Sequence, residues 1–155
     1  MSKEQDNKIM SAVLADDVDR MCAWLHAGGD PNMHVTFTTP FPMPLLCFTA
    51  SVAPGARVAQ LLMEHKACVR TTSDCTGCKP LHMACGRIKN SKAVAKLVAL
   101  FLQHGANPNE PGANGIVLPL VSASRHYHVD AVRQLLAAKA DLAAETSLGK
   151  TAIGA

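Results

Sequence analysis

The chain has 155 residues, of which 48% are hydrophobic and 17% are charged, so it is neither disordered nor long enough for separate cofactor and substrate domains. Its 15 Lys plus Arg and 12 Asp plus Glu give a net charge of +3 without a basic run, and its aromatic residues are one Trp, one Tyr and four Phe. We therefore expect a single domain over residues 1–155 that has no nucleic-acid surface.

The N-terminal residues 1–8 alternate charges and lack the apolar core of a secretory signal, which predicts a cytoplasmic or nuclear protein in a reducing compartment. Residues 31–56 contain no charged side chain and are long enough to raise the question of a membrane span. The prolines at positions 31, 40, 42, 44 and 54 would break such a helix repeatedly. We expect no membrane contact.

A Leu-rich phrase recurs along the chain, at residues 25–32, 62–70 and 102–109 and more faintly at 136–142. Its equivalent residues Gly29, Ala67, Ala106 and Ala140 are 38, 39 and 34 positions apart. A Pro-Leu pair precedes each later copy, and residues 151–153 begin a further one. This period indicates a stacked array with insertions.

Each copy predicts the same pair of helices. A proline such as Pro80 presets the backbone of a first helical residue, and a short apolar helix of about two turns follows it. A second helix then carries apolar residues at three- and four-residue spacing, as in residues 94–102. Neither helix can bury its apolar face alone, so we expect stacking to form the core, with Leu97 and Leu135 inside it.

The turns between these helices also have recognisable signals. Gly105, and Gly28 or Gly29 in the first copy, suit a left-handed helix exit that a side chain would resist. Asn114 followed by Gly115 suits a tight turn that leads to the next copy.

The copies resemble ankyrin repeats. The resemblance is carried by residues 79–84, by the Leu-Leu pairs, by His128 and by residues 105–109, while residues 9–32 resemble an N-terminal cap. It implies an all-α fold, an ankyrin-repeat solenoid of stacked helix-turn-helix units with hairpin-like fingers. The expected units number four, at about 5–37, 38–74, 75–113 and 114–146, plus the start of a fifth at 147–155.

The copies differ in detail. Asn32 and Pro44 are 12 residues apart where the later equivalents are 10 apart, which predicts a longer first finger. The third copy spans 26 residues from its proline to Ala106, against 21 in the next, and we expect the extra five around residues 86–92, in the loop or helix ends. Val121 replaces the motif histidine, so the hydrogen bonds made by that ring should be absent there. The short fifth copy predicts a fragment of a longer array, and a tail laid over the last helix pair is the alternative.

One stretch could carry metal chemistry. Cys75, Cys78, His82 and Cys85 supply three thiols and an imidazole, and Cys75-x-x-Cys78 has the spacing of a zinc-binding loop. The resemblance instead implies that His82 is a structural ring bonded to backbone and that Cys85 is a small buried residue. A redox switch at Cys75 and Cys78 is a further alternative. We expect no bound metal and regard these four residues as a weak candidate site.

No catalytic constellation is visible. His26, His65 and His104 recur at the same helix-end position, where hydrogen bonds to open carbonyls explain them. The sequence has no glycine-rich phosphate loop, nucleophile elbow or His-Glu-x-x-His run. We predict no enzyme activity, no cofactor and no small-molecule substrate.

The finger tips and the exposed sides of the inner helices should line one concave face. In the first finger, Phe37, Thr38, Phe41 and Met43 lie in an uncharged segment, where aromatic and Met side chains make good anchors. The alternative is that Phe37 and Phe41 fold back over the first unit. Further candidates on this face are Arg70, Thr72, Asp74, Arg87, Lys89, Asn114, Arg125, His126 and Tyr127, the last of which stands where the family has glycine.

The sequence thus predicts a non-catalytic protein-protein interaction module that binds another protein through its finger tips and concave inner-helix face. A substrate-recruiting ankyrin segment of a longer enzyme or effector is the alternative from another class. A zinc- or redox-regulated scaffold acting through Cys75 and Cys78 is the lesser alternative.

Overall fold

The computed structural model describes residues 3–36, 41–52, 56–74 and 76–154. These ranges contain eight α-helices and almost no strand, which confirms the prediction of a mainly helical protein. The helices are α1 (Lys3–Leu14), α2 (Val18–His26), α3 (Leu45–Val52), α4 (Arg57–Glu64), α5 (Pro80–Arg87), α6 (Ser91–Gln103), α7 (Pro119–Arg125) and α8 (Val129–Ala137). The remaining elements are the strands β1 (His34–Val35) and β2 (Met43–Pro44) and the short 3-10 turn η1 (Ala113–Gly115). Of the helices described, none is both long and apolar enough to cross a bilayer.

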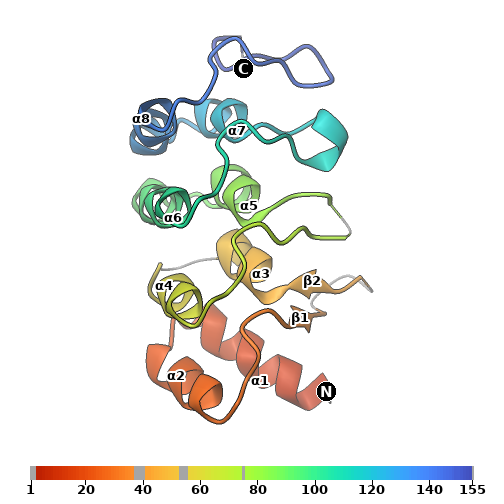
Figure 1. Cartoon of the computed structure of the whole chain (residues 1–155), viewed down its shortest axis with the longest axis vertical. Coiled ribbons are helices and arrows are strands. Elements are labelled where there is room, and N and C mark those ends of the chain that lie inside the picture. The colour runs from red at the N-terminus through yellow and green to blue at the C-terminus, as the bar shows by residue number, and fades with distance from the viewer. Residues whose placement is uncertain (1–2, 37–40, 53–55, 75, 155) are drawn as a thin grey trace.

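The helices form two layers along the long axis of the molecule (Figure 1). The helices α1, α3, α5 and α7 form the inner layer, and α2, α4, α6 and α8 form the outer layer. In the inner layer α3 packs on α5 and α5 on α7, and in the outer layer α2 packs on α4 and α6 on α8. The connections from one helix pair to the next project away from the outer layer, and we call residues 33–44, 69–79 and 110–118 the first, second and third fingers (Figure 1).

Each outer helix ends with the same backbone hydrogen bond. The N–H groups of Gly29, Ala67, Ala106 and Ala140 donate to carbonyls five residues earlier, at 3.1 Å for Gly29 and 2.9 Å for the others. The residue before each of them is left-handed, with φ of 91° at Gly28, 66° at Lys66, 83° at Gly105 and 64° at Lys139. The predicted left-handed exits are confirmed, and the aligned positions are structurally equivalent.

The helix starts also follow the sequence signals. Pro80 is the first residue of α5 and Pro119 is the first residue of α7, as predicted. The Asn90 side chain caps α6 by accepting hydrogen bonds from the N–H groups of Lys92 at 3.1 Å and Ala93 at 3.3 Å. That cap fixes the start of α6 at Ser91.

The outer helix α6 is longer than its neighbours. It has 13 residues, whereas α4 has 8 and α8 has 9. Ser91 lies 15 residues before Ala106, whereas Val129 lies 11 residues before Ala140, so the added residues form an extra turn at the N-terminal end of α6. The prediction that the third copy is lengthened around residues 86–92 is confirmed, and the helix ends take up the added length.

Packing between the layers forms the core. Leu97 and Leu135 are fully buried, as predicted, and so are the rings of Phe48 and Phe101. Because these side chains come from successive helix pairs, most of the apolar burial depends on stacking rather than on any single pair.

Asparagine side chains bridge neighbouring helix pairs. Asn109 Oδ1 accepts from the N–H of Asp141 at 2.7 Å, and its Nδ2 donates to the Lys139 carbonyl at 2.9 Å. Asn32 makes the same two contacts with the next pair, at 2.7 and 3.4 Å. Arg70 occupies the equivalent position at the junction between them, and a guanidinium cannot accept a hydrogen bond.

The last described residues depart from the sequence-based expectation. Ala152 and Ile153 form bends, and no helix begins at Thr151. The N–H of Thr146 donates to the Lys150 carbonyl at 2.9 Å, which closes a turn just before this segment. Three residues supply too few intrahelical hydrogen bonds to offset the cost of nucleating a helix.

Candidate functional site

Backbone hydrogen bonds connect neighbouring fingers. The Gly77 carbonyl in the second finger accepts from the N–H of Ala113 in the third, at 3.2 Å. The Gly115 carbonyl in the third finger accepts from the N–H of Ser147 beyond α8, at 2.8 Å. Asn114 has φ of 57° and an exposed side chain, which confirms the tight turn predicted there. These finger tips are therefore held in place by the fold itself.

The first finger is closed by a short hairpin. Strands β1 and β2 pair antiparallel, with Val35 opposite Met43. Met43 is half-buried and packs against the core, whereas the side chain of Phe41 is 59% exposed. Phe37 and Thr38 lie outside the described residues. Of the four candidates on this finger, Phe41 is the one that the structure shows at the surface.

The second finger presents the polar candidates. Arg70, Thr72 and Asp74 are all exposed. The N–H of Ser73 donates to the Cys78 carbonyl at 2.9 Å, which closes the finger behind Asp74. These three side chains are therefore available to a partner from an ordered loop.

Tyr127 lies in the turn that joins α7 to α8. Its φ is 57°, in the left-handed region, and its side chain is 86% exposed. The resemblance places glycine here, and a residue with a Cβ atom in this conformation costs roughly 1–2 kcal/mol. Arg125 and His126 precede it and are also exposed. The fold thus presents an aromatic ring to solvent from a strained backbone.

Two pockets show which candidates the fold brings together. Lys89 and His126 line a pocket of 250 Å³ between the turns that follow α5 and α7. Arg125 lines a pocket of 170 Å³ with Ile116 of the third finger. Arg87 is the last residue of α5, and its side chain is outside the described set. Neither pocket includes a residue of the first or second finger, so the candidates form separate groups along the molecule.

His82 is a structural residue. Its Nε2 donates to the Glu110 carbonyl at 2.7 Å, and its Nδ1 accepts from the N–H of Lys79 at 3.2 Å. Burial lowers the pKa of His82, although Glu110 acts in the opposite direction. The Lys79 ammonium is ion-paired with the Glu110 carboxylate. The expectation of a histidine ring bonded to backbone is confirmed.

The fold buries or hydrogen-bonds the described residues of the weak candidate metal site. Both nitrogens of His82 are engaged, and Cys85 is fully buried, where burial raises the pKa of its thiol to about 12. A thiol that stays protonated is a poor metal ligand and nucleophile. Cys78 is buried as well, and Cys75 lies outside the described residues. Within the described ranges no three His, Cys, Asp or Glu side chains are grouped to hold a metal.

The recurring helix-end histidines also serve the fold. His65 Nδ1 donates to the Leu61 carbonyl at 3.0 Å, and His104 Nδ1 donates to the Leu100 carbonyl at 2.9 Å. The predicted bonds to carbonyls are confirmed for these two residues, although each carbonyl is not open, because it also accepts from the backbone N–H of the same histidine. The ring of His26 packs against that of His65 with their centroids 5.9 Å apart.

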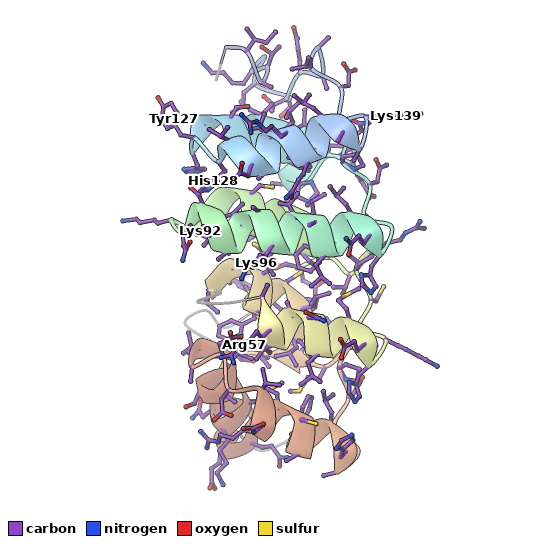
Figure 2. All side chains as sticks on the ribbon, turned by 90° about the vertical axis from the view of Figure 1, so that its left-hand side faces the viewer. Arg57, Lys92, Lys96, Tyr127, His128 and Lys139 are labelled. Carbon is purple, nitrogen blue, oxygen red and sulfur yellow. The ribbon has the colours of Figure 1, made fainter. Side chains whose placement is uncertain are left out.

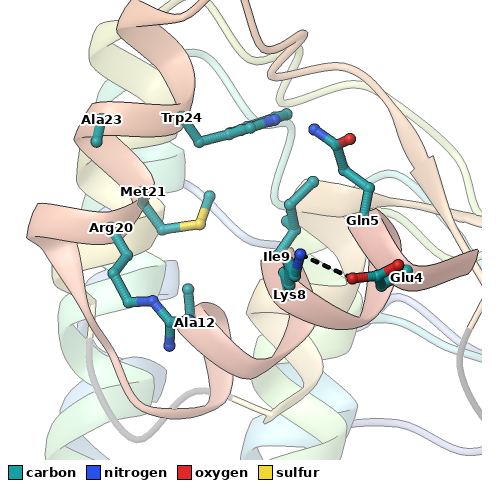
Figure 3. A pocket seen from close by; sticks show the side chains of 9 residues that line it. All are labelled: Glu4, Gln5, Lys8, Ile9, Ala12, Arg20, Met21, Ala23 and Trp24. Atoms are coloured by element: carbon teal, nitrogen blue, oxygen red, sulfur yellow. Dashed lines mark ion pairs between the residues drawn. The ribbon is translucent and has the colours of Figure 1, made fainter. Parts of the chain in front are cut away.

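Two larger hollows lie where sequence reasoning had no candidate. Figure 3 shows a pocket of 530 Å³ between α1 and α2, with Trp24 on one side and the Glu4–Lys8 ion pair at its rim. The second is a groove of 810 Å³ between α4 and α6. The available signal for the groove was the four-residue spacing of Lys92 and Lys96, which places both on one helix face.

Comparison with known families agrees with the geometry of the central part of the chain. Residues 76–113 match the family model described as ankyrin repeat. The matched segment contains α5 and α6 and ends at the tip of the third finger. No curated protein matches the chain.

Proposed function

Because residues 76–113 are an ankyrin repeat, we propose that the whole described chain is an ankyrin solenoid that binds another protein and catalyses no reaction. The repeat is a protein-protein interaction module. In support of the wider array, the same helix exit recurs at Gly28, Lys66, Gly105 and Lys139. The proposed units are four, at about 5–37, 38–74, 75–113 and 114–146, followed by the start of a fifth.

The observation that carries the binding proposal is the state of Tyr127. A large aromatic side chain that is 86% exposed contributes almost nothing to the core, and its left-handed backbone makes it more costly than glycine. Backbone strain at a residue that adds no stabilising contact is typical of residues that take part in recognition. Tyrosine also offers a large rigid contact at low entropic cost, which suits an interface anchor.

The mechanism of binding is preorganisation. The second finger is tied to the third through Gly77, and the third to Ser147 through Gly115, so these two fingers need gain little order when a partner docks. The proposed contact residues are those of the finger tips and helix turns, namely Phe37, Thr38, Phe41, Met43, Arg70, Thr72, Asp74, Arg87, Lys89, Asn114, Arg125, His126 and Tyr127. Among the described ones Tyr127 and Phe41 are the expected anchors, since they expose the most aromatic surface.

The test is an affinity capture followed by a quantitative measurement. A partner captured from extract by the tagged chain is identified, and its Kd is measured with wild type, Tyr127→Ala and Phe41→Ala. Val129→Ala is the control, because Val129 is an apolar residue of the outer layer that is 58% exposed. We expect the two aromatic variants to weaken binding by roughly tenfold or more and the control to leave it unchanged. Equal affinities for all four proteins would refute this assignment of the binding face.

A further inference from the structure

The outer layer is interrupted between α4 and α6. On either side of this point the outer helices pack directly, α2 on α4 and α6 on α8, while α4 and α6 make little direct contact. The inner helices α3 and α5 pack closely at the same level, so the separation is confined to the outer layer. The result is the groove of 810 Å³ that runs between α4 and α6.

The unequal lengths of the two helices shape this groove. Arg57 begins α4 10 residues before Ala67, whereas Ser91 begins α6 15 residues before Ala106. Because Ala67 and Ala106 are equivalent, the extra turn of α6 extends beyond the start of α4. Lys92 lies in that extra turn and lines the groove.

The α6 wall is positively charged in a way that does not serve the fold. Lys92 and Lys96 are four residues apart, both are exposed, and α6 contains no acidic residue. Like charges at this spacing destabilise a helix, and cations near a helix N-terminus oppose its dipole. Within the described ranges neither lysine forms an ion pair.

On the α4 wall, Arg57 is ion-paired and Glu64 is hydrogen-bonded to a neutral amide. Arg57 Nε donates to Asp16 Oδ2 at 2.9 Å. Near the other end, Gln60 Nε2 donates to Glu64 Oε1 at 3.0 Å. Figure 2 shows Arg57, Lys92 and Lys96 on the same side of the outer layer, where α4 and α6 face each other. The unneutralised positive charge of the groove is therefore concentrated near the start of α6.

Between these walls the groove has apolar surface. Ala56 on one side and Ala93, Ala99 and Leu100 on the other contribute to its lining. Three of these four residues are alanines, so they leave room for apolar side chains of a docked segment. The combination of a recessed apolar strip and a basic edge suits an amphipathic helix.

We propose that the groove between α4 and α6 docks an acidic amphipathic helix of a partner protein, as a second binding surface separate from the fingers. The apolar face of the docked helix lies on Ala56, Ala99 and Leu100, and its acidic residues meet Lys92 and Lys96. From Lys92 to Gln103 the groove wall measures about 17 Å, which accommodates about three helical turns.

The walls favour such a helix over a flat or uniformly anionic partner. Glu64 also lines the groove near the end of α4, and its carboxylate would repel a phosphate backbone or an anionic bilayer there. An amphipathic helix can carry acidic residues opposite Lys92 and Lys96 and polar or basic residues opposite Glu64, which a uniformly anionic partner cannot do. Its side chains can also enter the recess, which a bilayer surface cannot.

The test uses a displayed library of peptides of about 16 residues. Leucines are fixed at helical spacing, and the other positions vary among Asp, Glu, Lys, Arg, Gln and Ser. We expect peptides selected on the wild-type chain to be enriched in Asp and Glu. The best of them should bind the double variant Lys92→Glu/Lys96→Glu at least about tenfold more weakly. A version with Lys in place of its acidic residues should recover binding to that variant.

Two controls separate this outcome from others. The double variant should melt at or above the temperature of wild type, because acidic residues suit the start of α6. Lys139→Glu reverses an exposed cation outside the groove and should leave peptide binding unchanged. Tyr127→Ala, which tests the finger and turn surface, should also leave peptide binding unchanged.

Several results would overturn the proposal. These are a selection that yields no binder, one without acidic enrichment, and peptides that bind the double variant as well as they bind wild type. Tighter, Lys92- and Lys96-dependent binding to vesicles containing phosphatidylserine than to the selected peptides would assign the patch to a membrane surface. None of these results bears on the finger surface, which Tyr127→Ala probes separately.

Discussion

Replacing Tyr127 by glycine and by alanine separates the cost of backbone strain at this position from the contribution of the aromatic ring. Both variants lose the ring, which is 86% exposed, and they differ only in the Cβ atom. A Cβ atom at a left-handed φ of 57° costs roughly 1–2 kcal/mol, and glycine loses about 0.5–1 kcal/mol more backbone entropy on folding. Tyr127→Gly should therefore be more stable than Tyr127→Ala by about 0.5–1 kcal/mol.

The sign of this difference is the informative quantity. At an ordinary helical position the order reverses, and alanine is the more stable residue by a similar amount. Equilibrium unfolding in urea measures both variants on the same scale. If Tyr127→Ala equals or exceeds Tyr127→Gly in stability, the turn between α7 and α8 is not left-handed in solution and the argument from strain fails.

Lys139 provides a matched comparison. Its φ is 64° and its side chain is exposed (Figure 2). Lys139 lies just after the C-terminal end of α8, whereas Tyr127 lies just before the N-terminal end of that helix. The Gly-minus-Ala difference at Lys139 should have the same sign and size as at Tyr127. Partner affinity should fall in both Tyr127 variants and in neither Lys139 variant, because Lys139 is outside the proposed contact residues. A loss of affinity in Lys139→Gly would mean that strain relief, and not the missing ring, weakens binding.

The other predictions concern the core, the histidine contacts and the junctions between helix pairs. Leu97→Ala should destabilise the protein by about 2–5 kcal/mol in urea unfolding, and a cost as small as that of an exposed substitution would place Leu97 outside the core. The pKa of His82 is lowered by burial, so its contribution to stability is complete above its ordinary pKa of 6.5 and declines as the pH falls below that value. His82→Gln should flatten the stability profile between about pH 7 and 5, and an unchanged slope would contradict this assignment. Asn109→Ala should cost about 1–2 kcal/mol through its two lost hydrogen bonds. Arg70→Asn should raise stability by about 0.5–1.5 kcal/mol by restoring the bridge at the junction that lacks it, and a loss there would show that the junctions are not equivalent.

The repeat period was predictable because it rests on local chemistry. A left-handed helix exit needs glycine or a tolerant residue at one position, and the next N–H must close the same hydrogen bond each time. That constraint makes Gly29, Ala67, Ala106 and Ala140 recognisable as equivalent positions, although the spacings between them are 38, 39 and 34. The role of His82 was implied by the resemblance to ankyrin repeats, and its ring is bonded to backbone groups of Lys79 and Glu110 as that resemblance implied.

The groove between α4 and α6 was not predictable, because it depends on where added residues enter the structure. The length difference around residues 86–92 was visible, but it allowed either a longer loop or a longer helix. The Asn90 cap decides in favour of helix, and Ser91 beside it is an equally good capping residue by type. Only the packed structure shows that the two outer helices lie apart at this level.

The sequence also could not predict which single side chains are exposed. Met43 and Phe41 are two residues apart in one uncharged segment, yet Met43 packs against the core while Phe41 is mostly exposed. Met43 lies in β2, where it pairs with Val35, whereas Phe41 precedes the strand, and the sequence does not show where the pairing begins.

Tyr127 and the lysines of α6 share a physical property that connects the two proposed surfaces. Each violates a local rule of its own element, a left-handed turn in one case and a helix N-terminus in the other, and each does so at the surface where no core packing compensates. Tyr127 belongs to the turn between α7 and α8, whereas Lys92 and Lys96 line the groove between α4 and α6. Because they have no pocket in common, their effects on stability and on binding should be additive. A variant that combines Tyr127→Ala with Lys92→Glu/Lys96→Glu should lose each interaction to the same extent as the separate variants do. Coupling between the two losses would mean that one partner spans both surfaces.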